Sequence, residues 1–192
     1  MRKLGLAVFF VFHTAVTLAQ KNVVVDVLLT ETLQQRNEVS YAAPLLSWDD
    51  FKGRPDENTP WTAVTYSGIK LRCESKLNSG TLHLQIKLFP YMDRSRSWYK
   101  ASGHNNYTLS HEQRHFDITI LVTRQLAEAL QQATYSYKTY NKQIDAIHDA
   151  YLRKLNEMQD LYDKETDHGM KRSAQRAWDR DIAQKLAQYA VN

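Results

Sequence analysis

The spacing of apolar residues changes near position 108, and this change limits the fold more than any other feature of the chain. Before it, apolar and polar residues alternate in two runs, Ile69 to Glu74 and Thr81 to Leu88. Such alternation is typical of strands with one buried face, and Asn78-Ser79-Gly80 between the runs predicts a turn, hence an antiparallel hairpin. After it, apolar residues recur every three or four positions, as in helices. Strands followed by helices indicate an α+β fold.

The N-terminal third predicts one further strand and two irregular segments. Asn22 to Leu29 is rich in β-branched residues and predicts a first strand. The polar stretch 30–41 predicts a loop or a short helix. Trp48 and Phe51, followed by turn-forming residues, predict an ordered loop that is anchored by its two aromatic rings.

Three helices are predicted after the hairpin. The first is long and begins near Thr108, with Asn106 or Thr108 itself as the N-cap. The second runs to about His168 and ends at Gly169, and the third carries its apolar stripe from residue 174 to 189. We therefore expect an N-terminal antiparallel β-sheet packed on the long helix, followed by two further helices.

Residues 1–19 predict a signal peptide. Arg2 and Lys3 precede a mostly apolar run from Leu4 to Leu18, and Thr17-Leu18-Ala19 places small residues where a signal peptidase cuts. The run is short for a membrane span. We expect an exported protein, periplasmic or extracellular, that has no integral membrane span after cleavage.

The rest of the chain suits one compact domain, with a strand and loop over 20–45 and the main domain over 46–192. The formal net charge is +4, and the signal peptide carries two of these charges, which argues against nucleic acid as a partner. Cys73 is the single cysteine, so no internal disulfide can form. Any metal site must therefore use histidines and carboxylates.

The long predicted helix carries His111-Glu112-Gln113-Arg114-His115, which reads H-E-x-x-H. Positions i and i+4 lie on one helix face, so both imidazoles can point at one metal ion. Glu112 lies about 100° around the helix from His111, where it can take a proton from water at the open position of the metal. The motif predicts a zinc site with Glu112 as catalytic base. The alternative is an exposed polar helix turn that matches the motif by chance.

A catalytic zinc ion needs a third protein ligand. The apolar stripe of the second helix, extended past Tyr162, reaches Glu165 and His168, and both are predicted to face the first helix. His168 is the first choice as ligand, and Glu165 is the alternative or a residue that supports the ligands. Otherwise His168 only complements the helix dipole and Glu165 pairs with an arginine. Asp117 lies about 200° around the helix from His115 and is excluded.

Four segments occur in a characteristic order between about Leu46 and Leu186: W-D-D-F-K-G-R-P at 48–55, H-E-Q-R-H-F-D-I at 111–118, E-T-D-H-G at 165–169 and Q-R-A-W-D at 175–179. Together they resemble a bacterial domain family of unknown function that is described as predicted secreted zinc-dependent proteases. The resemblance implies a zincin-like metallopeptidase with His111 and His115 as zinc ligands and Glu112 as catalytic base. It also implies that the E-T-D-H-G segment belongs to the site.

We therefore expect a zinc-dependent peptidase that acts on peptide or protein substrates. The hairpin at 69–88 would offer the edge strand for an extended substrate, and Tyr162, His104 or a nearby arginine would stabilise the oxyanion. Two alternatives remain: a zinc-dependent amide hydrolase acting on cell-wall material, and a non-enzymatic module with structural zinc. A metal site closed by both Glu165 and His168 would favour the structural role, because no position is left for water.

Overall fold

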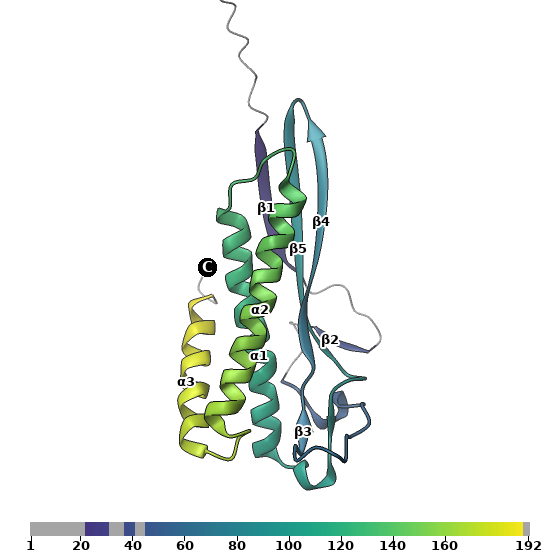
Figure 1. Cartoon of the computed structure of the whole chain (residues 1–192), viewed down its shortest axis with the longest axis vertical. Coiled ribbons are helices and arrows are strands. Elements are labelled where there is room, and N and C mark those ends of the chain that lie inside the picture. The colour runs from purple at the N-terminus through teal and green to yellow at the C-terminus, as the bar shows by residue number, and fades with distance from the viewer. Residues whose placement is uncertain (1–21, 31–36, 41–44, 190–192) are drawn as a thin grey trace, which may run out of the picture.

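The computed structural model describes residues 22–30, 37–40 and 45–189. The predicted signal peptide, residues 1–19, lies outside the described residues. Within them, strands precede helices, and the predicted α+β class is confirmed. The molecule is elongated, with the sheet along one side and the helices along the other (Figure 1).

Strand β5 (Thr81–Asp93) is the centre of the main sheet. It pairs along almost its whole length with the antiparallel β4 (Ser67–Asn78), and the predicted hairpin is confirmed. The turn residues Ser79 and Gly80 have φ values of 47° and 82°. Glycine suits this left-handed backbone, which is why the chain can reverse in two residues.

The other edge of β5 carries β1 (Val23–Leu29) and β2 (Glu38–Ser40). β2 is antiparallel to β5, but β1 is parallel to it, so the predicted antiparallel sheet is wrong for its first strand and the sheet is mixed. Alternate side chains of β1 are half-buried, and either strand direction would bury the same face. The composition of residues 23–29 therefore predicts a strand without predicting its direction.

Helices α1 (Asn106–Gln132), α2 (Tyr140–Thr166) and α3 (Arg172–Gln188) follow the sheet. The N-cap of α1 is Asn105, one residue before the predicted positions, and its side chain accepts a hydrogen bond from the Thr108 N–H. α2 ends at Thr166, two residues earlier than predicted.

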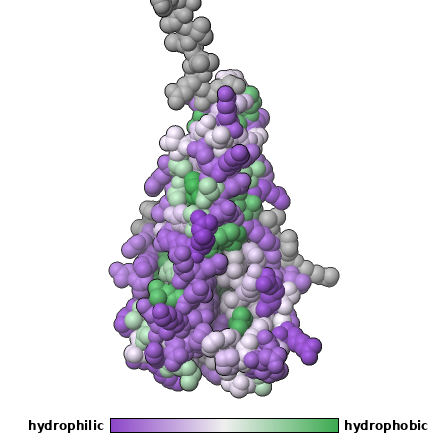
Figure 2. Space-filling view, viewed as in Figure 1, coloured by the Kyte–Doolittle hydropathy of each residue, from purple (hydrophilic) through white to green (hydrophobic). Residues whose placement is uncertain are grey.

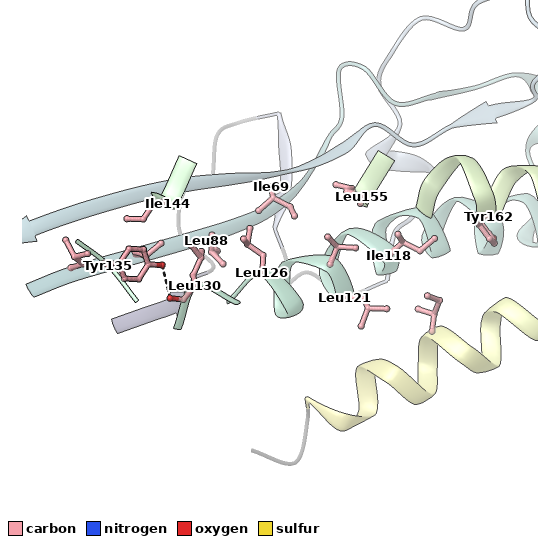
Figure 3. Close-up of a cluster of buried hydrophobic side chains, with 14 of the residues drawn as sticks. Ile69, Leu88, Ile118, Leu121, Leu126, Leu130, Tyr135, Ile144, Leu155 and Tyr162 are labelled. Atoms are coloured by element: carbon pink, nitrogen blue, oxygen red, sulfur yellow. Dashed lines mark hydrogen bonds between the residues drawn. The ribbon is translucent and has the colours of Figure 1, made fainter. Parts of the chain in front are cut away.

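α1 lies between the sheet and α3, and the main core forms around it (Figure 3). Leu84, Ile86 and Leu88 of β5 are at most 1% exposed, and apolar side chains of all three helices close the same core. A second cluster joins Phe51 to Phe116 of α1, beside the short helix η1 (Trp48–Asp50). α1 is thus held from several sides, which fixes the positions of its polar side chains.

A small two-stranded sheet lies near the start of α1 (Figure 1). It pairs β3 (Ala63–Val64) with β6 (Trp98–Tyr99), and η2 (Ala101–Gly103) connects β6 to α1. The surface of the face in Figure 2 is mostly hydrophilic, with scattered apolar residues. In the part of the chain that the structure describes, no helix is both long enough and apolar enough to span a membrane.

Candidate metal centre

The H-E-x-x-H motif lies in the second and third turns of α1, and its two histidines and Glu112 are buried. The exposed fractions of His111, Glu112 and His115 are 5%, 3% and 8%. Three titratable side chains in such a place are costly unless each has a charged or hydrogen-bonding partner. The partners of the two histidines come from α2 and α3, which pack against α1.

Asp163 of α2 faces both histidines. Its Oδ1 atom lies 3.2 Å from Nε2 of His111 and 3.0 Å from Nε2 of His115. One ligand atom from each of the three side chains falls within 4.8 Å of the others. Neighbouring ligands of a tetrahedral zinc ion lie about 3.3 Å apart, because each bond is about 2.0 Å long. The spacing around Asp163 is therefore close to what a metal ion requires.

Two glutamines bind the far nitrogens of the same imidazoles. Oε1 of Gln175 lies 2.9 Å from Nδ1 of His111, and Oε1 of Gln159 lies 2.5 Å from Nδ1 of His115. The N–H groups of the same amides fix their orientation. Nε2 of Gln175 donates to the Asp179 carboxylate, and Nε2 of Gln159 donates to the His115 carbonyl. Each glutamine thus presents an acceptor, and each Nδ1 must carry the proton.

This arrangement leaves the two Nε2 atoms as the groups that face Asp163. In neutral imidazoles they carry lone pairs, and the carboxylate is also only an acceptor, so a proton or a metal ion must lie between them. Burial lowers the pKa of His115, but the hydrogen bond to Asp163 and the charge of Glu112 outweigh it, and the pKa is raised. Burial raises the pKa of Asp163, but hydrogen bonds from both histidines hold that pKa below its usual range. A proton on His115 would compete with a metal ion for the Nε2 lone pair, so metal binding at this site is expected to strengthen as the pH rises.

The environment of Glu112 differs from that of the three clustered side chains and indicates a different role. Its Oε2 atom is buried and has no hydrogen-bond partner among the described residues. The residue borders a cavity of about 570 Å³ that His111, His115 and Asp163 also line. An unpaired buried carboxylate oxygen beside such a cluster suits a group that takes a proton from water.

The cavity has two chemically different walls. One comes from α1, α2 and the turn that follows α2, and it holds the carboxylates and imidazoles. The other is the segment 60–65, which includes β3. The residues that line the cavity are Pro60, Trp61, Thr62, Ala63, Val64, Thr65, Tyr107, Thr108, His111, Glu112, His115, Asp163, Asp167, His168, Gly169 and Met170.

His168 lies in the cavity wall but beyond the end of α2. Asp167, His168 and Gly169 all have left-handed backbones, with φ of 51°, 49° and 84°. The His168 ring packs on Trp61, with centroids 3.6 Å apart, and its Nδ1 lies 3.5 Å from Oδ2 of Asp163. His168 therefore contacts the carboxylate oxygen that does not face the other two histidines.

Glu165 lies apart from the cluster. It is exposed, and its Oε2 accepts a hydrogen bond from Nε1 of Trp178 at 2.8 Å. The buried stripe continues from Tyr162 to Thr166, four positions on, and this places Glu165 on the outer face. Asp117 is also outside the cluster, where it binds Gln113 and Arg114.

Sequence reasoning missed Asp163, although a signal was present. Gln159 and Asp163 are four positions apart on α2, as His111 and His115 are on α1. Two such polar pairs on helices that pack together would meet in the interior. Following only the apolar stripe of α2 conceals this second pair.

The other residues predicted to take part in catalysis or substrate binding lie outside the cavity lining. Tyr162 is fully buried, with its hydroxyl bound to the His111 carbonyl and to Gln175, and His104 stacks on Tyr99. Neither borders the cavity, and neither does the predicted edge at 69–88; the segment 60–65 takes that position. Tyr162 and His104 are therefore poorly placed to stabilise an oxyanion.

Replacing Gln175 with Leu is expected to weaken zinc binding about 10- to 100-fold, because His111 then loses the acceptor that fixes its tautomer. Competition with a zinc-binding dye measures the affinity. Gln184→Leu, at an exposed position of the same helix, is the control and should leave it unchanged. Equal affinities in wild type and Gln175→Leu would show that the hydrogen bond has no such role.

Together these features define an α+β protein whose central helix carries a candidate metal centre completed by the two helices that follow. The model of a bacterial protein family of unknown function (DUF922) matches residues 60–169, more than half of the chain. The chain belongs to this family. The description of the family states no activity. Neither a curated protein nor a solved structure matches the chain.

Proposed function

We propose that this protein is a zinc-dependent hydrolase of peptide bonds. The observation that carries the proposal is the buried Oε2 atom of Glu112, which has no hydrogen-bond partner among the described residues and lies in the wall of a cavity that the His111, His115 and Asp163 cluster also lines. A base, a set of metal ligands and space for a substrate are the parts that metal-assisted hydrolysis needs.

The cluster suits zinc in its donor types, because two imidazoles and one carboxylate are a ligand set of catalytic zinc sites. His111, His115 and Asp163 would hold the ion, and His168 remains the rival for the third position. Zinc bound there would supply a Lewis acid and lower the pKa of water to about 7. Gln159 and Gln175 keep both imidazoles in the tautomer that presents Nε2.

Glu112 acts on protons in this proposal. Its carboxylate accepts the proton of the attacking water and then passes it to the amine that leaves. Burial at 3% exposure keeps the carboxylate away from bulk solvent and fixes it beside the cavity. A general base must lie within reach of the water whose proton it takes. Glu112 follows directly after His111, one of the proposed ligands, and therefore lies beside the metal centre.

β3 offers an edge for an extended substrate. The register pairs Ala63 with Tyr99, while the neighbouring Lys100 N–H binds the Thr62 carbonyl. Ala63 is therefore at a non-hydrogen-bonded position of this ladder, so its own N–H and C=O point away from β6. A peptide strand could add to this edge beside the metal centre.

A purely structural zinc site fits these observations less well. Closure by both Glu165 and His168 would leave no position for water, but Glu165 binds Trp178 on the outer face. The cavity also reaches the cluster directly. Together with the predicted signal peptide, this supports a hydrolase that works outside the cytoplasm.

Metal removal tests the proposal. Purified protein is expected to contain one zinc per chain and to cleave casein or unstructured peptides. A chelator should abolish cleavage and lower the melting temperature by about 10 °C, since the loss of a tightly bound ligand costs about 4 kcal/mol of stability. Zinc should restore both. Zinc-loaded protein that cleaves cell-wall fragments and no peptide would replace the proposed substrate, and the lack of any zinc would refute the proposal.

A further inference from the structure

Two large apolar side chains lie exposed at the cavity, next to the candidate metal centre. The exposed fraction is 79% for Met170 and 38% for Trp61. Both line the cavity, and so do Pro60, Val64 and Tyr107. Exposed apolar residues are ordinary when single, but several around one concave site point to an apolar ligand group.

Charge is distributed unevenly around the same cavity. Every carboxylate and imidazole that lines it belongs to the wall formed by α1, α2 and the turn that follows α2. The opposite wall, residues 60–65, reads P-W-T-A-V-T and carries no ionisable side chain. A charged substrate group that contacts only residues 60–65 would lose water without gaining a charged partner there.

Of the two exposed apolar side chains at the cavity, Trp61 is held in place and Met170 is adaptable. The Trp61 ring packs against the His168 ring, with centroids 3.6 Å apart and planes inclined at 33°, so its position is set before any substrate arrives. Met170 is unbranched and exposed, which lets it adjust to side chains of different shape. The open edge at Ala63 lies two residues from Trp61, so a peptide bound there passes this ring.

We propose that Trp61 and Met170 bind a large apolar side chain of the peptide substrate, at a residue next to the bond that is cleaved. This inference rests on the proposed function and deepens it by naming the substrate class: peptides with Leu, Phe or Met beside the scissile bond. Acidic side chains are rejected at that position. One apolar contact of this kind changes the specificity constant about 10- to 200-fold.

A library of peptides in which one central position is varied over all residue types tests the preference. Cleaved bonds, identified by mass spectrometry, are expected to have a large apolar residue on one side. Met170→Glu should lower cleavage beside Leu or Phe about 10-fold or more relative to cleavage beside Lys. Leu77→Glu is the matched control, because Leu77 is an exposed leucine of β4, outside the cavity lining. Cleavage without regard to side chain, or an unchanged preference in Met170→Glu, overturns the inference.

Binding separates this inference from the proposed function. Zinc-loaded Glu112→Gln protein is titrated with two dipeptide hydroxamates that differ only in a Leu or a Glu side chain. The Leu compound is expected to bind about 10-fold more tightly, and Met170→Glu in the same background should remove the difference. If wild-type protein cleaves no peptide, the proposed function fails, and this titration alone decides the inference. Equal binding of the two compounds overturns it even when peptides are cleaved.

Discussion

Replacing Glu112 with Gln is expected to lower peptide hydrolysis about 10³-fold while zinc stays bound. The amide has almost the shape of the carboxylate but cannot accept the proton of the attacking water, and a general base contributes about this factor, or about 4 kcal/mol of the barrier. Because Oε2 of Glu112 has no hydrogen-bond partner among the described residues, its replacement breaks no side-chain bond of that atom. The measurements are kcat/KM on a peptide substrate and zinc content by atomic spectroscopy.

Glu128→Gln is the matched control for this experiment. Glu128 lies on the same helix, is exposed, and binds the hydroxyl of Tyr189 far from the cavity. Its replacement should leave both activity and zinc content unchanged. Full activity in Glu112→Gln would remove the catalytic base from the proposal, whereas loss of zinc in that variant would give Glu112 a role in metal binding.

The second large effect concerns the third ligand. Asp163→Ala is expected to weaken zinc binding about 100-fold or more, since the variant removes the one oxygen that faces both histidines. Glu165→Ala should leave zinc affinity unchanged, because Glu165 binds Trp178 on the outer face. Calorimetric titration of chelator-treated protein with zinc measures the affinity, and circular dichroism confirms that each variant is folded.

His168→Ala completes the comparison. With Asp163 as third ligand, this variant is expected to lose much less affinity than Asp163→Ala, since His168 contacts only the other carboxylate oxygen, at 3.5 Å. The reverse order of the two variants would assign the third position to His168. Equal and large losses in both would indicate four protein ligands and a structural zinc site.

Periodicity predicted most of the fold because each element buries one face. The alternation over 69–88 and the helical spacing after residue 108 correspond to β4, β5 and α1. The direction of β1 was not predictable in this way, since its burial pattern is the same for either pairing. It depends instead on how the chain returns to the sheet.

The site was predictable where its residues share one helix. His111, Glu112 and His115 form a local pattern, and the structure brings them to one cavity. Which α2 side chains face the histidines depends on where that helix ends and on its orientation about its own axis. A shift of one position, from Glu165 to Thr166 in the buried stripe, turns Glu165 outward. Asp163 then meets the histidines, and this angle is set by packing between helices.

The last helix has a consequence for how the molecule can be divided. α3 begins after the family-matched segment ends at residue 169, yet Gln175 is 2% exposed and bonded to His111, and Ile182 is fully buried in the core. A fragment trimmed to the matched boundaries would expose the flank of α1 and leave one imidazole without its acceptor. A fragment that keeps both the core and the site therefore has to extend beyond the recognised segment.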